Sequence, residues 1–259
     1  MITAKTQNHH EIANNLMEKN PLLKDIHAVI YSELNNSKKI SNTTIVNKLK
    51  ETNSQVIGLH APKRNGKDTF ASYMNDAYNK VLKDGSFIRL GFGEPMKNMV
   101  HQLTNCPKEW LWGEDTERET PRDTFHGLSG RKVLQLTGNE LSRKLYGQEF
   151  WTGLWNYQIC ENKLSEKSMV VIPDVRFEGD AKAVKNLNGL LLRIKRENLK
   201  NTDQHEAEKP LPYGTCDFSI KNEDLNKLSK SATYITKSVI TDLPFIATDY
   251  SRYNIYREI

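Results

Sequence analysis

Apolar residues in this 259-residue chain occur in short continuous runs that alternate with stretches at helical spacing. Between and after the runs, apolar residues return every three or four positions, which indicates amphipathic helices. Strands that alternate with helices predict an α/β fold, a three-layer arrangement with a mainly parallel sheet flanked by helices. The short runs are typical of buried strands and lie at 56–59, 86–92, 168–174, 189–195 and 216–222.

The stretch before the first run, residues 1–53, has a helical pattern of its own. Apolar side chains recur at helical spacing from Ile12 to Leu34, and Pro21 suits the first turn of a second helix. The capping residues 41–43 predict a third, short helix. We interpret this stretch as an added α-helical extension for packing or oligomerisation, with a binding role as the alternative.

Two later stretches interrupt the pattern. Residues 105–129 contain prolines, tryptophans and the charge-rich run EDTERE, and we expect a mobile insertion with solvated charges. Residues 197–214 lack apolar periodicity and are expected to form a lid-like loop. The predicted domains are therefore the extension over 1–53, an α/β core over 54–240 and a C-terminal tail over 241–259.

Composition and charge limit the class of protein. Apolar residues make up 37% of the chain and aromatic residues 8%, which is compatible with a globular fold. The net charge of +5 suits an anionic ligand but is too small for a protein that coats nucleic acid, so we expect no direct nucleic-acid partner. The three cysteines form no metal-ligand pattern. Without a signal peptide or an apolar run of ~18 residues, a cytoplasmic protein with no membrane partner is expected.

The segment that joins the first strand to the next helix, APKRNGKDT (61–69), has the character of a phosphate-binding loop. Gly66 lets the backbone wrap closely, so that successive amides can point at phosphate oxygens. The following helix adds the positive end of its dipole, and Lys67 adds a mobile charge for the terminal phosphates. The sequence therefore predicts that this loop binds phosphate.

The loop departs from the usual pattern G-x-x-x-x-G-K-[ST] at two positions. Ala61 stands where the first glycine belongs, and Asp68 stands where the Mg²⁺-binding hydroxyl belongs. Asp68 could hold Mg²⁺ directly or through water, or Thr69 could take the hydroxyl role. The alternative is a polar strand-to-helix turn capped by Asn65 or Asp68.

Charged residues also follow the other predicted strands. Asp174 and Arg176 end the third, Arg193 and Arg196 end the fourth, and Lys97 lies in the helix turn after the second. Because ligands bind at the carboxyl ends of parallel strands, we expect these residues near the loop. A carboxylate at a strand tip can orient Mg²⁺, and the arginines can reach phosphate. For Lys97, a solvated surface lysine is an equal alternative.

A helix predicted over residues 130–147 has a polar face suited to nucleotides. Arg131 and Arg143 could bind phosphate in bidentate fashion, and Gln135 and Glu140 could hydrogen-bond sugar or base. An ordinary salt-bridged helix face is the alternative.

In the lid-like loop, His205, Glu206 and Glu208 have the residue types of metal ligands. No second histidine or cysteine lies nearby, so we favour a contact of the lid over a metal site.

Taken in order, these segments resemble the bacteriophage deoxynucleoside monophosphate kinases, within the P-loop nucleoside monophosphate kinase group. Asp68 after the loop lysine is usual in this family, whereas Ala61 and Ala207 depart from its pattern. The resemblance does not cover the helices before Val56 or the tryptophan-rich insertion. It covers about two thirds of the chain and rests on KRNGKDT, GEPMK, RKVLQLTGNELSRKL followed by FW, IPDVRF, HEAEKPLP and CDFSIKN.

The resemblance implies a P-loop NTPase-type fold and transfer of the γ-phosphoryl group of ATP, with Mg²⁺, to the 5′-phosphate of a deoxynucleotide. The implied catalytic residues are Lys67, Arg176, Asp174 and Arg193. The implied ATP-phosphate ligands are Arg64, Asn65, Gly66, Lys67, Asp68, Thr69 and Arg196, and the implied metal ligands are Asp68, Thr69 and Asp174. The implied substrate-binding residues are Lys97, Arg131, Gln135, Glu140, Arg143, His205 and Glu208.

Two alternative functions stay open from the sequence. The acceptor could be another small molecule, such as dephospho-coenzyme A or a nucleoside, or the chain could be a non-catalytic nucleotide-binding scaffold. The accepted bases and the oligomeric state, including a homodimer, are also open. If the protein is phage-encoded, the expected location is the host cytoplasm.

Overall fold

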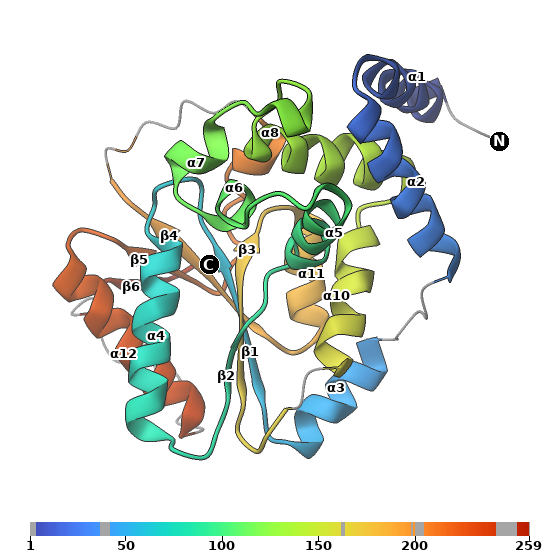
Figure 1. Cartoon of the computed structure of the whole chain (residues 1–259). Helices are drawn as coiled ribbons and strands as arrows, with labels where there is room; N and C mark the ends of the chain where they lie inside the picture. Colours follow the sequence, from blue (N-terminus) through green and yellow to red (C-terminus); the bar gives the residue numbers. More distant parts are fainter. Residues whose placement is uncertain are drawn as a thin grey trace. The chain divides into compact units, whose positions relative to one another are not determined.

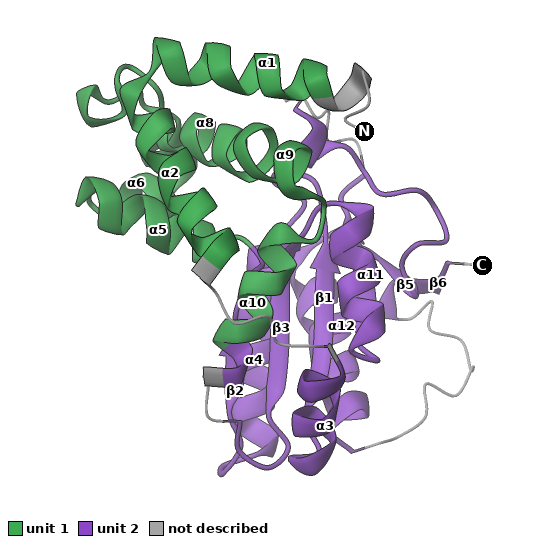
Figure 2. Cartoon of the chain, turned by 90° about the vertical axis from the view of Figure 1, so that its right-hand side faces the viewer, with its two compact units in different colours: residues 1–39, 93–158 green, residues 40–92, 159–259 purple. Residues whose placement is uncertain are grey.

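The computed structural model describes residues 4–36, 42–161, 164–197, 199, 205–241 and 253–258. The chain forms two compact units, each built from segments far apart in the sequence (Figure 2). Unit 1 contains residues 1–39 and 93–158, and unit 2 contains residues 40–92 and 159–259. The units divide the chain differently from the predicted domains, whose boundaries stay predictions. Parts of the predicted lid (198 and 200–204) and of the predicted tail (242–252 and 259) lie outside the described residues.

Among its described residues, unit 2 contains a six-stranded sheet with the order β2-β3-β1-β4-β5-β6 (Figure 1). All neighbouring strands are parallel except β6, which pairs antiparallel with β5. The predicted α/β fold with a mainly parallel sheet is confirmed, and β6 adds a strand that the sequence analysis did not expect. The strands are β1 (Gln55–His60), β2 (Phe87–Arg89), β3 (Met169–Val175), β4 (Leu190–Lys195), β5 (Phe218–Lys221) and β6 (Ile255–Arg257).

Helices cover both faces of this sheet. On one face, α4 (Lys67–Val81) and α12 (Leu225–Ile240) pack on a buried cluster that includes Ile57 and Leu59. On the other face lies α11 (Glu178–Asn186), and it comes so close that a Cβ atom on Gly58 would lie 2.9 Å from the side chain of Val184. Side chains alternate between the faces along a strand, which explains why Gly58 stands between two large residues. Unit 2 also contains the short helix α3 (Asn42–Glu51).

Unit 1 is helical. Its core contains Leu23, Ile26 and Ile30 from α2 (Pro21–Asn36) together with Leu111 and Phe125, all of them buried. The predicted insertion (105–129) therefore contributes to a core, and it pairs its charges as well: Glu117 with Arg122, and Asp115 and Glu119 with Arg131. Its helices are α1 (Ala4–Lys19), α2 (Pro21–Asn36), α5 (Glu94–Thr104), α6 (Glu109–Trp112), α7 (Asp115–Glu119), η1 (Asp123–Phe125), α8 (Gly130–Gln135), η2 (Leu136–Arg143), α9 (Lys144–Tyr146) and most of α10 (Phe150–Glu161).

The helix predicted over 130–147 is interrupted in its middle by η2, which is a π-helix. The wider turn of a π-helix changes which carbonyl groups have partners. The Ser142 hydroxyl donates to the carbonyl oxygen of Thr137 (2.7 Å), and the indole N–H of Trp151 donates to the Ser142 hydroxyl (2.7 Å). The predicted continuous helix is therefore wrong over 136–143, and its end near Gly147, where φ is +107°, is confirmed.

The parallel register places the carboxyl ends of β1, β3 and β4 side by side. His60 at the end of β1 lies opposite Val175 of β3 and Arg193 of β4. The register of β1 and β3 shifts beside Pro173, which has no N–H to donate to the ladder. In the part of the chain that the structure describes, no helix is long and apolar enough to span a bilayer.

Candidate active site

The loop between β1 and α4 turns through a left-handed backbone conformation at Gly66, where φ is +95°. Glycine adopts this conformation without strain. A Cβ atom here would also lie 2.4 Å from Nδ2 of Asn222, which donates a hydrogen bond to the carbonyl oxygen of Asn65 (2.9 Å). Both the backbone angle and the close approach of Asn222 therefore require glycine.

Asn65 shapes the loop from the inside. Its buried side chain donates from Nδ2 to the carbonyl oxygens of Pro62 and Lys63 (3.2 Å each), and its Oδ1 accepts from the backbone N–H of Arg196 (2.7 Å). The predicted phosphate ligands Asn65 and Arg196 thus lie together. The amide of Asn65 is turned toward backbone groups, whereas the side chain of Arg196 is exposed.

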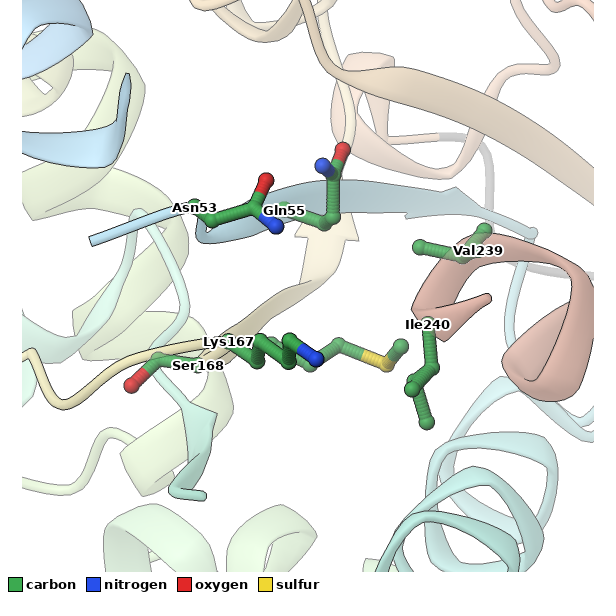
Figure 3. A pocket seen from close by; sticks show the side chains of 7 residues that line it. Asn53, Gln55, Lys167, Ser168, Val239 and Ile240 are labelled. Carbon is green, nitrogen blue, oxygen red and sulfur yellow. The ribbon is translucent and has the colours of Figure 1, made fainter. Parts of the chain in front are cut away.

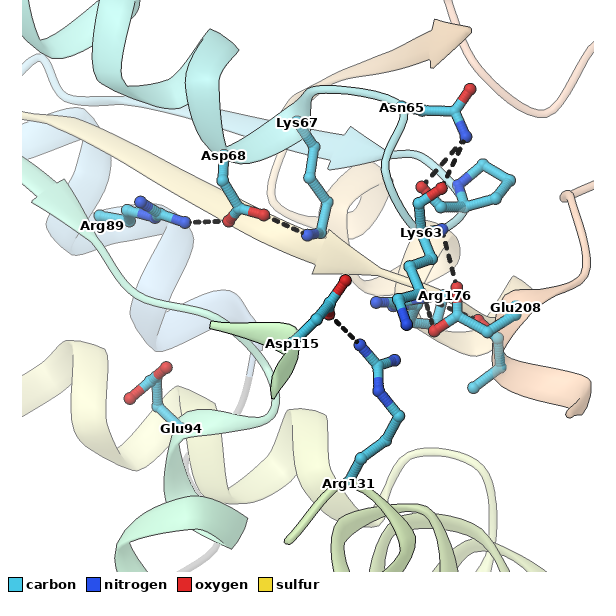
Figure 4. A network of polar contacts seen from close by, with 12 residues as sticks. Lys63, Asn65, Lys67, Asp68, Arg89, Glu94, Asp115, Arg131, Arg176 and Glu208 are labelled. Carbon is cyan, nitrogen blue, oxygen red and sulfur yellow. Dashed lines mark hydrogen bonds and ion pairs between the residues drawn. The ribbon is translucent and has the colours of Figure 1, made fainter. Parts of the chain in front are cut away.

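Lys67 opens α4, and charged groups from several elements surround it (Figure 4). Its ammonium group pairs with Asp68, which also pairs with Arg89 at the end of β2. Burial lowers the pKa of Lys67, and the nearby Arg176 adds to this effect, while Asp68 and Asp174 oppose it. Asp174 and Arg176 come from the end of β3, the strand next to β1 in the sheet. Arg89 was not predicted, because a single arginine at a strand end carries no signal of its own.

Asp174 is held by the backbone that follows β2. Its Oδ1 accepts from the N–H of Phe92 at 2.7 Å, and a Cβ atom on Gly91 would lie 2.7 Å from its Oδ2. Gly91 was not predicted as a site residue, although a glycine shortly after a strand can mark such a close approach.

Arg176 and Glu208 form an ion pair beside the loop (Figure 4). Nη1 of Arg176 lies 2.7 Å from Oε1 of Glu208 and donates to the carbonyl oxygen of Ala207 (3.0 Å). The buried Glu208 also accepts from the backbone N–H of Lys63 through Oε2 (2.8 Å). Glu208, predicted to bind substrate, therefore contacts the loop and Arg176.

Arg193, predicted to be catalytic, is buried and engaged in structural contacts. Its guanidinium group pairs with Glu258, which follows β6, and donates to the carbonyl oxygens of Leu211 (3.0 Å) and Pro212 (2.9 Å). This arrangement gives the predicted catalytic role no support. Arg193 instead ties the segment around 211 to the last strand. The sequence could not reveal this pairing, because 65 positions separate Arg193 from Glu258.

His60, at the end of β1, was not predicted as a site residue. Its Nδ1 lies 2.9 Å from the carbonyl oxygen of Val175, and its Nε2 accepts from the N–H of Leu211 (3.1 Å). A carbonyl can only accept, so the proton must be on Nδ1. Burial lowers the pKa of His60 to about 4, and the imidazole is therefore neutral at physiological pH.

Two further loop residues and His205 complete the predicted set in unit 2. Arg64 is exposed and has φ of +63°, and Thr69 is half-buried in the first turn of α4. His205 caps the short helix η3 (Glu206–Glu208), where its Nδ1 accepts from the N–H of Ala207 (3.1 Å). We see in this cap a structural role for His205.

The groups around Lys67 fit the coordination chemistry of Mg²⁺. This ion prefers oxygen ligands and typically binds one or two carboxylates together with water and substrate phosphates. Asp68 and Asp174 supply the carboxylates and Thr69 a hydroxyl. Among the described residues, no cluster of three or more histidine, cysteine, aspartate or glutamate side chains forms a self-contained metal site. A cation that depends partly on phosphate oxygens suits this donor set.

In unit 1, Lys97 lies in the first turn of α5 and pairs with Glu94 (3.2 Å). The other oxygen of Glu94 accepts from the indole N–H of Trp112 (2.8 Å), and the Lys97 ammonium lies 5.6 Å from the centre of that indole ring. The tryptophan-rich insertion thus fixes the position of a predicted substrate-binding lysine.

The other predicted substrate-binding residues of unit 1 lie on α8 and η2. Arg131 pairs with Asp115 (2.9 Å; Figure 4) and with Glu119 (3.3 Å), both from the insertion. Gln135 ends α8 and is half-buried, and Glu140 pairs with the following Lys144 (2.8 Å). Arg143, the last residue of η2, is buried. The predicted acceptor residues of helices α5, α8 and η2 therefore all belong to unit 1, and the phosphate loop belongs to unit 2.

A small pocket lies at the opposite, amino end of the sheet (Figure 3). It has room for about one water molecule. A nucleotide cannot bind there. The residues that line it are Asn53, Gln55, Lys167, Ser168, Met169, Val239 and Ile240.

A parallel sheet with a glycine-lysine loop at its carboxyl edge, ringed by carboxylates and arginines, defines a P-loop kinase. The model of the deoxynucleotide monophosphate kinase family matches residues 122–231. A protein of Acanthamoeba polyphaga mimivirus, named as a deoxynucleotide monophosphate kinase, is 32% identical over 179 residues, which cover 66% of this chain and 86% of that protein. The deoxynucleoside-5′-monophosphate kinase of Escherichia phage T5 is 21% identical over 238 residues, covering 72% of this chain and 89% of that protein.

The chain belongs to the deoxynucleotide monophosphate kinase family. It is accordingly a phosphotransferase that acts on small-molecule substrates and phosphorylates deoxynucleoside monophosphates, with ATP as the donor implied by a kinase family. The resemblance found in the sequence is confirmed.

Proposed function

We propose that the residues around Lys67 hold ATP and Mg²⁺ and that the predicted substrate-binding residues of α5, α8 and η2 hold the deoxynucleotide whose 5′-phosphate accepts the γ-phosphoryl group. One observation carries this proposal. Lys67 stands at the start of α4 and pairs with Asp68, and Asp174 and Arg176 lie at the end of β3, the strand next to β1. A cation at a helix N-terminus, with carboxylates for a metal and an arginine beside it, suits a nucleoside triphosphate.

The reaction requires little general acid–base catalysis from the protein. The acceptor phosphate is already a nucleophile, so the obstacle is to align two polyanions and to stabilise the charge on the transferred group. Bound Mg²⁺ would neutralise part of the phosphate charge. Asp68 and Asp174 would hold it, with Thr69 as a further ligand.

Lys67 and Arg176 would act directly on the donor phosphates. Lys67 would exchange its ion pair with Asp68 for the terminal phosphates, which leaves the carboxylate for the metal. Arg176 would contribute a cation from the end of β3, like an arginine finger supplied in cis. The exposed side chains of Arg64 and Arg196 and the Gly66 amide would add phosphate contacts.

Lys97 and Arg131 would bind the acceptor phosphate. Glu94 and Trp112 hold Lys97 in place, and the acceptor phosphate would compete with Asp115 and Glu119 for Arg131. Arg143 would add positive charge, and Gln135 and Glu140 would hydrogen-bond the sugar or base. We further propose that the protein acts in the cytoplasm of a host cell, without a nucleic-acid partner, and that a homodimer is compatible with this role.

A coupled assay of ADP release over the four common deoxynucleoside monophosphates tests the reaction. Turnover with one or more of them is expected, and dephospho-coenzyme A and nucleosides should not serve as acceptors. Turnover only with another acceptor would favour a related P-loop kinase, and ATP binding without transfer would favour a scaffold.

Lys67→Ala tests the donor site. We expect it to reduce turnover by about three orders of magnitude, which corresponds to about 4 kcal/mol of transition-state stabilisation. Lys80→Ala, an exposed lysine in the last turn of the same helix, is the matched control and should leave turnover unchanged. Near-normal turnover of Lys67→Ala would refute the assignment of the loop.

A further inference from the structure

The segment 205–212, expected from the sequence to belong to a lid, is held to the carboxyl edge of the sheet at three places. His60 accepts from the N–H of Leu211, Arg193 donates to the carbonyl oxygens of Leu211 and Pro212, and Glu208 contacts the phosphate loop and Arg176. All of these residues belong to unit 2. The segment therefore has a fixed position beside the loop, and it contacts the loop through the carboxylate of Glu208.

Glu208 is 3% exposed and engages both of its oxygens. Oε2 accepts from the N–H of Lys63 (2.8 Å), and Oε1 lies 2.7 Å from Nη1 of Arg176. A buried carboxylate is costly unless it is paired and hydrogen-bonded. The buried Glu208 carboxylate is therefore stable only while it keeps both the Lys63 N–H and the Arg176 guanidinium group as partners.

The contacts of Arg176 are concentrated on one nitrogen. Both Glu208 and the carbonyl oxygen of Ala207 engage Nη1. Within the described part of the chain, Nε and Nη2 form no hydrogen bond with protein. The pairing therefore fixes the guanidinium plane and leaves its other edge for a ligand with phosphate oxygens, which an arginine can bind in bidentate fashion.

We propose that Glu208 is a positioning residue for phosphoryl transfer: it orients Arg176 toward the donor phosphates and fixes the Lys63 amide of the phosphate loop, without contacting substrate itself. His60 and Arg193 hold the segment that carries Glu208. The inference rests on the proposed function, because it assumes that Arg176 acts on the donor. This positioning role differs from the substrate-binding role predicted for Glu208 from the sequence.

Glu208→Gln tests this role. The amide keeps the shape and can still accept from the Lys63 N–H, but it loses the charge that holds Arg176. A hydrogen bond to a charged group contributes about 1.5–3 kcal/mol, so we expect about a 10- to 100-fold loss in kcat/KM for ATP. KM for the deoxynucleotide should stay within about twofold of its original value. Glu206→Gln, an exposed carboxylate of the same short helix, is the matched control.

A double-mutant cycle separates positioning from a merely structural role. If Glu208 acts through Arg176, Glu208→Gln should have almost no further effect in an Arg176→Ala background. Equal fold-losses in the two backgrounds would overturn the proposal. Where turnover of Arg176→Ala falls below detection, the same cycle is measured on the Kd of a fluorescent ATP analogue, with the same two outcomes.

The fold and the proposed function have their own readouts. Thermal unfolding shows whether Glu208→Gln is folded, and if it is not, Glu208→Asp replaces it in the cycle, because it keeps the charge with a shorter reach. Failure of the proposed function would appear as no transfer by the unchanged protein, and the ATP-affinity cycle would still test the positioning. A folded Glu208→Gln with unchanged kcat/KM and ATP affinity would refute the inference.

Discussion

Protonation of His60 should destabilise the fold in a defined pH window. The imidazole is buried between β1, the end of β3 and the segment around 211. The pKa of His60 is lowered from 6.5 to about 4, mainly by burial; the hydrogen bond to Val175 opposes this shift, and the nearby Arg193 and Arg176 add to it. A proton on Nε2 would also turn the acceptor of the Leu211 N–H into a donor.

The magnitude follows from the two pKa values. Between pH 6.5 and pH 4 the unfolded chain binds a proton at this position and the folded chain does not, so stability falls as the pH falls through this window. The full difference corresponds to about 3 kcal/mol, and about 2 kcal/mol of it is lost between pH 8 and pH 5. Against a typical stability of about 5–15 kcal/mol, this is a measurable share.

Urea unfolding at pH 8 and pH 5, followed by circular dichroism, measures the effect in the unchanged protein and in His60→Gln. The variant should be less stable at pH 8, because it loses the buried imidazole and its hydrogen bonds. Since glutamine does not titrate, the difference in unfolding free energy between the two proteins should shrink by about 2 kcal/mol at pH 5. Asn8→Ala, at an exposed residue of α1, is the control, because it changes no titratable group and should keep the original pH dependence. A gap that stays the same at both pH values would refute the reasoning, as would an NMR titration that gives His60 a pKa near 6.5.

Three further predictions concern individual side chains. Gly91→Ala should push the carboxylate of Asp174 aside, because the new Cβ would lie within 2.8 Å of it. Overpacking of this kind costs about 1–3 kcal/mol, so we expect about a tenfold lower kcat and a higher Mg²⁺ concentration for half-maximal activity. Trp112→Phe removes the indole N–H donated to Glu94 and should raise KM for the deoxynucleotide about fivefold. Asp115→Asn removes an anion that competes for the arginine of α8 and should lower that KM about two- to fivefold at low salt.

Each of these variants has an outcome that would contradict it. Normal Mg²⁺ dependence of Gly91→Ala would show that the carboxylate is not part of the metal site. If Trp112→Phe changed only the KM for ATP, Lys97 would belong to the donor site and not to the acceptor site. A lower affinity of Asp115→Asn for the deoxynucleotide would mean that the carboxylate orients the arginine and does not compete for it. Lys132→Ala, an exposed residue of α8, is the control.

The sheet and the phosphate loop could be predicted because their signals are local. The longer strands β1, β3 and β4 each contain a short apolar run, and the loop combines a buried strand, Gly66 and Lys67 within a dozen positions. The roles of strand-end residues were harder to predict. A parallel sheet places Arg193 beside β1, but its burial depends on Glu258, far away in the sequence.

Other features leave almost no local signal. Strand β6 has three residues, of which only Ile255 is buried, so no alternation of apolar and polar residues can develop. The π-helix over 136–143 differs from an α-helix by about one residue per turn, which an apolar pattern over two turns cannot resolve. The fixed position of His60 depends on Leu211, and no spacing rule connects them.

The interleaving of the two units has a consequence during synthesis. Leu23, Ile26 and Ile30 leave the ribosome early, yet their core partners Phe125 and Trp151 are translated more than 90 residues later. At about 5–20 residues per second, the apolar stripe of the nascent chain waits roughly 5–25 s for its partners. During this interval the exposed apolar side chains of α2 can be bound by chaperones, and in a cell that lacks chaperones aggregation should begin at α2.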